Sequence, residues 1–252
     1  MAEKRESART TIILSLVTVA VAAYALLFGL QTLIYFEAHH WASATPTLNE
    51  IPRPLPSTVA STPEEKDLSF YGYQFAAPWK GITKQNPEND RSEIDFKSGA
   101  ALVFFNPEGE KNIVDSIRTG DPKTYARYQA VFGTNLFAND YALYLAVYSA
   151  SPAAISPFMS RDEAVRISTL LQWKLAFGSD GTKSIYTLQA GDNRGLQFGD
   201  PARDHIVVVR LFDSHGQQVR LLFTSKSPQT GTFSQANINC VVDSIRPAAS
   251  LQ

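Results

Sequence analysis

Two adjacent histidines, His39 and His40, are the residues of this sequence whose types could most readily bind a metal or relay a proton. They stand in the stretch FEAHHW, beside Glu37 and Trp41. Neighbours on a helix point about 100° apart, whereas helical metal pairs favour i,i+4 spacing, and neighbours on a strand point to opposite faces. The spacing therefore favours anchoring at a membrane interface, between Tyr35 and Trp41, over a shared ion.

Acidic residues that could do acid–base or calcium chemistry have simpler structural interpretations. Asp162 and Glu163 follow Ser160, and Ser160 with Glu163 matches a capping box at the start of a helix. Three Gly-Asp pairs are turn signals whose spacing fits no calcium loop: 120–121, 191–192 and 199–200. The sequence therefore predicts no metal site and no cofactor.

The chain contains none of the GxSxG, P-loop, GxGxxG, HExxH and EF-hand motifs. A hydrolase site assembled from His205 or His215 with Ser214 or Ser225 remains open as an alternative. The single cysteine, Cys240, excludes an internal disulfide and lies in an apolar stripe, which predicts a buried structural thiol. These patterns favour a protein without catalysis.

One long apolar segment dominates the N-terminal part. From Thr10 to Phe36 there are 27 residues without a formal charge, enough to cross a bilayer with tilt to spare. Lys4, Arg5 and Arg9 precede this run, which predicts a cytoplasmic N-terminus and an extracytoplasmic remainder. Cleavage of a signal peptide after Ala44 is the alternative, but the run is longer than a signal h-region, which favours an uncleaved signal-anchor in a single-pass protein of the cell membrane.

The sequence divides into four parts. Residues 1–9 are the expected cytoplasmic tail, 10–36 the transmembrane helix, 37–66 a proline-rich extracytoplasmic linker and 67–252 a globular domain. The linker has no glycine in 42–66 and is expected to act as an extended spacer. Net charge is −1 with no cluster of basic residues, which argues against binding of nucleic acid.

Strands and helices are expected in mixed order within the globular part. Residues 68–79 alternate as one strand, 99–105 form a buried strand and Pro122 opens a helix that continues to 132. Residues 140–150 fit either a strand or a helix, and the proline at 152 favours the strand.

The C-terminal half has clearer signals. A helix follows Ser160, with an apolar stripe of Ala164, Ile167, Leu171 and Leu175, and ends at Gly178. Four strands separated by short turns follow, which is the pattern of an antiparallel meander. A closing helix carries a second stripe: Ile238, Val241, Val242 and Ile245. The expected fold is α+β, an antiparallel sheet sandwiched by helices.

The opening GYQFAAPW (72–79), the late meander and the closing CVVDSIRP (240–247) resemble PsbP-type domains, the superfamily of the extrinsic photosystem protein and its bacterial relatives. The likeness covers residues 70–246. It implies an α/β/α sandwich of a kind used for docking or assembly more often than for catalysis. The anchor and the proline-rich linker depart from that family, and no binding residue is carried over from it.

These observations favour a membrane-anchored extracytoplasmic domain that binds a protein partner. The expected interaction surface is an exposed aromatic patch on the sheet, with four candidates: Tyr144, Tyr148, Trp173 and Tyr186. The alternative is a module that binds a lipid or small molecule in a pocket between sheet and helices.

Overall fold

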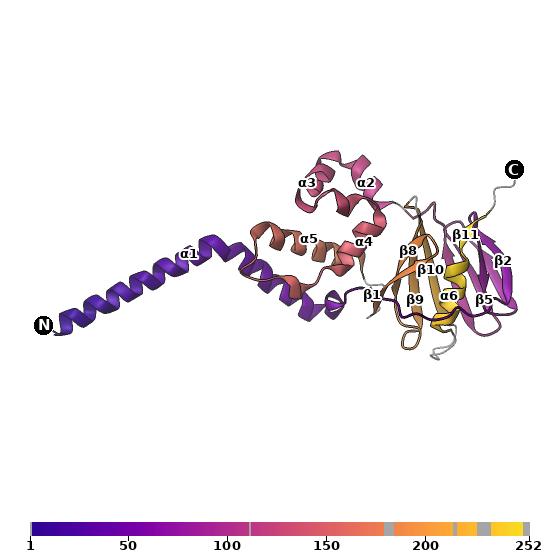
Figure 1. Cartoon of the computed structure of the whole chain (residues 1–252), viewed down its shortest axis with the longest axis horizontal. Coiled ribbons are helices and arrows are strands. Elements are labelled where there is room, and N and C mark those ends of the chain that lie inside the picture. Colours follow the sequence, from indigo (N-terminus) through magenta and orange to yellow (C-terminus); the bar gives the residue numbers. More distant parts are fainter. Residues whose placement is uncertain (1, 111, 179–183, 214–215, 226–232, 249–252) are drawn as a thin grey trace.

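The computed structural model describes residues 2–110, 112–178, 184–213, 216–225 and 233–248. The fold is α+β, with a long N-terminal helix and a mostly antiparallel sheet (Figure 1). The helices are α1 (Ala2–Ala44), α2 (Ile113–Gly120), α3 (Pro122–Phe132), α4 (Asp140–Ser149), α5 (Arg161–Phe177) and α6 (Gln235–Ser244). Short 3-10 helices are η1 (Pro46–Asn49), η2 (Thr134–Phe137) and η3 (Pro152–Ala154).

The main sheet has eight strands in the order β1-β7-β8-β9-β10-β6-β5-β4, and a second sheet has the order β11-β3-β2. All neighbours are antiparallel except β1 and β7. The strands of the main sheet are β1 (Arg53–Pro54), β4 (Ile82–Pro87), β5 (Arg91–Phe96), β6 (Ala100–Phe105), β7 (Ile185–Ala190), β8 (Asn193–Phe198), β9 (Ile206–Phe212) and β10 (Gln218–Ser225). The second sheet contains β2 (Glu65–Phe70), β3 (Tyr73–Ala77) and β11 (Arg246–Pro247).

The expected meander is confirmed as β7 to β10, and β6 confirms the buried strand. The single strand expected over 68–79 is wrong, because β2 and β3 form a hairpin that turns at Tyr71 and Gly72. Both residues have positive φ, 48° and 78°, and glycine adopts that conformation at no steric cost. Strands β4 and β5 were not expected, since their sequences are largely polar.

The strand favoured over 140–150 is also wrong, because this segment is helix α4. Asn139 caps its start, accepting a hydrogen bond from the backbone N–H of Ala142 at 2.9 Å. Leu143 and Val147 face the other helices, while Tyr144 and Tyr148 face the sheet. A helix buried on two sides is apolar nearly all round, so its period is hidden in the sequence.

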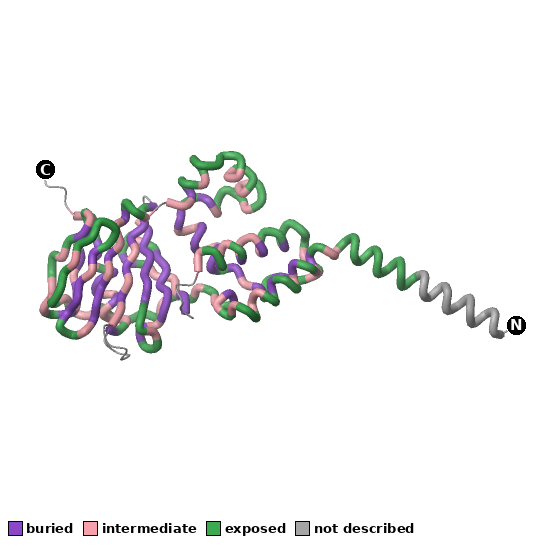
Figure 2. The backbone as a smooth tube through the Cα atoms, turned by 180° about the vertical axis from the view of Figure 1, so that it is seen from behind, coloured by how far each residue is buried: buried purple, intermediate pink, exposed green. Residues whose placement is uncertain are grey.

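The core lies on both faces of the main sheet. On one face, α6 and the second sheet cover β5, β6, β9 and β10, and on the other face α4 packs over β7 to β9 (Figures 1 and 2). Ile238, Val241 and Val242 of α6 are buried as expected, and so is Cys240. Helix α5 lies between α1 and α4.

Helix α5 confirms most of its predicted features. The Ser160 hydroxyl accepts a hydrogen bond from the backbone N–H of Glu163 at 3.2 Å, and Ala164 and Leu171 are fully buried. The predicted stripe is wrong at its end, where Leu175 is exposed and Lys174 is buried in its place. Four backbone carbonyl groups around Lys174, described below, account for this exchange.

Helix α1 reaches Ala44 and bends part-way along its length (Figure 1). Two features of α1 favour bending: Gly29 lacks a side chain, and the Thr32 hydroxyl donates to the Phe28 carbonyl at 2.9 Å. Beyond the bend the helix packs against α5, η1 and η3, burying Ile34 and Ala38.

The proline-rich segment lies against the domain and differs from the expected free spacer. We call residues 53–61 the strap. Arg53 and Pro54 pair with β7, and the backbone N–H of Ser61 donates to the Ala236 carbonyl at 2.9 Å. The Asn239 amide of α6 donates to the Thr58 carbonyl at 2.8 Å. The strap therefore joins the end of α1 to both β7 and α6.

Candidate functional site

Tyr144 and Tyr148, two of the four aromatic residues expected on an exposed patch, are buried beneath α4. The Tyr148 hydroxyl donates to the Gly178 carbonyl at 2.7 Å. The guanidinium of Arg210 on β9 donates to the Tyr144 hydroxyl at 3.3 Å and lies 5.3 Å from the centre of its ring. These tyrosines hold α4 on the sheet and offer no surface to a partner.

The other two candidates, Trp173 and Tyr186, are half-buried and lie on different elements. Tyr186 is on β7, where the Arg53 guanidinium of the strap lies 5.7 Å from its ring centre. Trp173 is on α5, with ring centres at 5.0 Å from Tyr128 and 5.4 Å from Phe132 of α3. The structure therefore does not bring the four residues together into one patch.

Trp173 instead lines an open cavity of about 500 Å³ bordered by residues of α2, α3, α4 and α5. We call it the helical pocket. Its lining is mostly apolar: Ile113, Ser116, Ile117, Gly120, Asp121, Thr124, Tyr128, Leu143, Trp173 and Phe177. An apolar cavity of this size, with a few polar groups, is typical of sites for small molecules.

The first wall of the helical pocket, α2, is fixed by two side chains at its start. Asn112 caps the helix, accepting from the backbone N–H of Asp115 at 2.8 Å. The fully buried carboxylate of Asp140 accepts from the backbone N–H groups of Ile113 and Val114, each at 2.9 Å. Burial raises the pKa of Asp140, although these two bonds favour its charged form. A residue at the start of α4 thus positions α2.

The outer wall, α3, has no buried residue. Asp121 caps it by accepting from the backbone N–H of Thr124 at 3.0 Å, and this bond lowers the pKa of Asp121. Three aromatic side chains attach the helix to the cluster around Phe137 and Trp173: Tyr125, Tyr128 and Phe132. These ring contacts attach α3 to the rest of the helical region, without any buried residue of its own.

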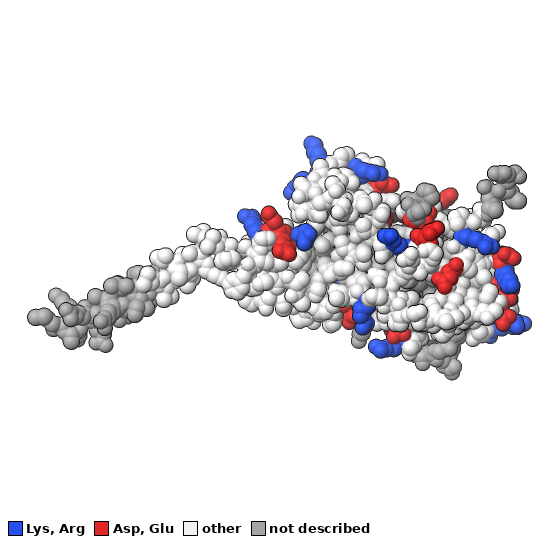
Figure 3. Space-filling view, viewed as in Figure 1, with Lys and Arg blue, Asp and Glu red and all other residues white. Residues whose placement is uncertain are grey.

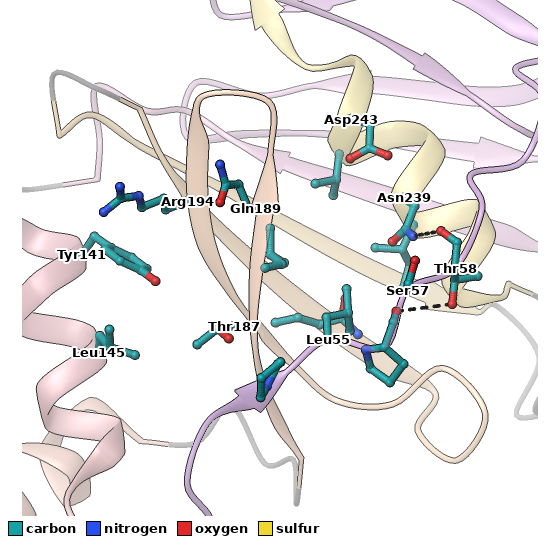
Figure 4. A pocket seen from close by; sticks show the side chains of 16 residues that line it. Leu55, Ser57, Thr58, Tyr141, Leu145, Thr187, Gln189, Arg194, Asn239 and Asp243 are labelled. Atoms are coloured by element: carbon teal, nitrogen blue, oxygen red, sulfur yellow. Dashed lines mark hydrogen bonds between the residues drawn. The ribbon is translucent and has the colours of Figure 1, made fainter.

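A second hollow, of about 600 Å³, lies around the edge of the main sheet at the β7–β8 hairpin (Figure 4). Tyr141, Leu145 and Arg194 lie on one side of this hairpin, while Asn239 and Asp243 of α6 lie on the other. Since the strand pair separates the two groups, they do not face a common ligand. The helical pocket is therefore the better candidate site.

Neither a protein-family model, nor a curated protein, nor a solved structure matches this chain. The resemblance to PsbP-type domains thus stays a prediction. The site has to be interpreted from its own geometry.

Residues suited to hydrolysis or metal binding are dispersed. His205 is exposed, and Ser214 and His215 lie outside the described residues. Within the described residues no group of three His, Cys, Asp or Glu side chains is placed to hold a metal ion. Gly191 and Asp192 form a turn, and Asp200 accepts a hydrogen bond from the backbone N–H of Ala202 at 3.0 Å, as the turn interpretation predicts. Asp121 instead caps α3.

Lys174 is the most unusual titratable residue of the helical region. Its side chain, 4% exposed, lies beneath α5, and four backbone carbonyl oxygens lie within hydrogen-bond distance of its ammonium group, which shares its three N–H donors among them. The distances are 3.0 Å to Leu48, 2.6 Å to Glu50, 2.9 Å to Tyr148 and 2.8 Å to Ala150. Burial lowers the pKa of Lys174 to about 8, against the opposing effect of the Glu50 charge. One cation thereby joins the end of α4 to the segment after α1.

The lowered pKa of Lys174 predicts a pH-dependent stability. The folded value is about 8 and the unfolded value 10.5, so between these limits the unfolded chain holds more protons. The free energy of unfolding should therefore rise with pH across this window relative to the Lys174→Met variant, measured by chemical unfolding of both proteins. If the difference in the free energy of unfolding between the two proteins stays constant across this pH window, the four carbonyls keep the amine charged in the folded state.

Proposed function

We infer that the protein is a membrane-anchored binding module whose helical pocket holds an apolar small molecule, with the tail of a lipid as the ligand class. One observation carries this inference. A cavity of about 500 Å³ lies among four helices, and aliphatic and aromatic side chains form most of its wall. The polar groups at the mouth, Ser116, Asp121 and Thr124, suit a ligand with an apolar body and one polar end.

The anchor belongs to the same proposal. In the described residues one helix, α1, is long and apolar enough to cross a membrane. Basic residues precede it and support a cytoplasmic N-terminus, with the globular domain outside the cell membrane. Cleavage after Ala44 would remove Ile34 and Ala38 from their packing with Leu171, which supports an uncleaved signal-anchor.

A PsbP-like sandwich remains part of the proposal. The late meander and the burial of Val241 and Val242 on α6 are consistent with it. Docking of a protein partner, which the sequence favoured, loses the support of Tyr144 and Tyr148 because both are buried. We therefore rank ligand binding above docking.

Photolabelling tests the helical pocket directly. The full chain, in lipid nanodiscs, is irradiated with hexadecanoate that carries a diazirine, and the adducts are mapped by mass spectrometry. We expect adducts on α2 and on the segment of α5 around Trp173. Ser116→Phe, which places a ring in the cavity, should remove most of these adducts.

Thr119→Phe is the matched control, because Thr119 is exposed on the same helix and does not line the cavity. Its labelling should equal that of the wild type. Adducts on α1 report the surrounding bilayer and should be the same in all three proteins. Labelling confined to α1 would overturn the binding proposal.

A further inference from the structure

The apolar run of α1 is longer than a bilayer requires. At about 1.5 Å per residue, residues 10–36 would extend about 40 Å, whereas the hydrocarbon core is about 30 Å thick. Residues 10–28 alone would extend about 28 Å. The structure offers a physical reason to end the membrane-spanning part of α1 near residue 28 and not at residue 36.

That reason is the contact between α1 and the start of α5. Phe158, just before α5, lies against α1, with ring centres 6.3 Å from Tyr24 and 5.9 Å from Phe28. Exposed charged side chains follow on the first turns of α5: Arg161, Asp162, Glu163 and Arg166. Figure 3 shows charge at this end of α5 and none along the described part of α1 leading to it.

These charges limit how deeply the start of α5 can enter the hydrocarbon layer of the membrane. A charged side chain is strongly disfavoured at the centre of a hydrocarbon layer. The first turns of α5 therefore lie in water or among headgroups, and the hydrocarbon ends near Phe28 and Phe158. Helix α1 also bends on its way to the domain (Figure 1).

Beyond the bend the two faces of α1 differ. One face, with Gln31, Ile34 and Ala38, is buried against α5 and η3. The opposite face carries Leu33 and Phe36, which remain 68% and 64% exposed. One turn later Glu37 and His40 make the same face polar. The apolar surface is thus continuous with the free part of α1 and stops at Phe36.

We propose that α1 leaves the hydrocarbon at its bend. Phe158 then lies at the hydrocarbon edge on one side of the helix, and Leu33 and Phe36 rest on the lipid bilayer on the other side. This rests on the proposal that α1 spans a membrane. Phe158, 71% exposed and packed on Tyr24 and Phe28, lies at the hydrocarbon edge where aromatic rings are favoured. The strap is bound to the domain and does not act as a free spacer. The contacts of α1 and Phe158 with the bilayer should therefore hold the domain directly on the membrane.

Fluorescence quenching by lipids tests these contacts. Full-length variants carry a fluorophore on one introduced cysteine, Leu33→Cys or Phe158→Cys, in a Cys240→Ala background. Gln172→Cys, exposed on α5, is the control. In vesicles containing phosphatidylcholine with a nitroxide near the glycerol end of its chain, the first two should lose most of their fluorescence and the control little.

A further variant, Leu26→Cys, separates this proposal from the anchor itself. Leu26 is exposed before the bend, so a nitroxide in the middle of the acyl chain should quench it strongly. Quenching at position 26 without quenching at 33 and 158 would overturn the proposed contact of these residues with the bilayer and leave the anchor intact. No quenching at 26 would overturn both. Disulfide-linked dimers of the unlabelled Leu33→Cys protein, with no lipid quenching of the labelled protein, would assign this face to a second copy.

Discussion

The Lys174→Met variant should lose about 1–3 kcal/mol of its free energy of unfolding, the cost of leaving buried backbone carbonyls without a hydrogen-bond donor. The methionine keeps the apolar stem of the side chain but donates no hydrogen bond. Four carbonyl groups would lose their donor: those of Leu48, Glu50, Tyr148 and Ala150. Each carbonyl left buried without a partner carries its own desolvation cost.

Chemical unfolding of the full chain in mild detergent measures this loss. Lys123→Met is the matched control, because Lys123 is exposed on α3 and the chemical change is the same. It should alter the free energy by less than about 0.5 kcal/mol. A loss of less than about 1 kcal/mol for Lys174→Met would contradict the assigned role of the four carbonyls.

The second large effect is expected at Asp140. The Asp140→Ala variant leaves the backbone N–H groups of Ile113 and Val114 without their acceptor, at a cost of about 2–4 kcal/mol. Because these groups begin α2, the first wall of the helical pocket should become less rigid as well. Amide hydrogen exchange at residues 113 and 114 should become faster, and photolabelling of the pocket should fall.

Two variants separate this effect from a general change of charge. Asp140→Asn keeps the shape and one acceptor oxygen, so it should cost about half as much. Asp115→Ala removes an exposed carboxylate from the same helix and should leave exchange at Val114 unchanged. Equal acceleration in the Asp115 and Asp140 alanine variants would show that Asp140 does not fix α2.

Local chemistry predicted much of the fold. The meander and the cap at Ser160 follow from turn residues and apolar periodicity, which act over a few positions. The error at α4 has a physical cause, because a helix packed on both sides shows no period. Asn139 was the available signal, since a capping residue marks a helix start and not a strand.

The candidate site was harder to predict. Trp173 was identified, but as an exposed aromatic of the sheet, whereas it lines a cavity between helices. The cavity depends on the docking of α2 onto Asp140, a contact between residues 26 and 27 positions apart, which local patterns do not encode. Helix α2 was not predicted, although a local signal was present: the capping residue Asn112, followed by Ile113, Val114 and Ile117 on one face.

The contact between Lys174 and Leu48, which lie 126 residues apart, has a consequence for synthesis of the chain. At about 5–20 residues per second, the ribosome would release α1 some 6–25 s before α5. During that interval the face with Ile34 and Ala38 lacks its partners from η3 and α5. In a nascent chain stalled before α5, the part of α1 beyond the bend should therefore remain inside the membrane. It should move to the bilayer surface only after the later helices have been made.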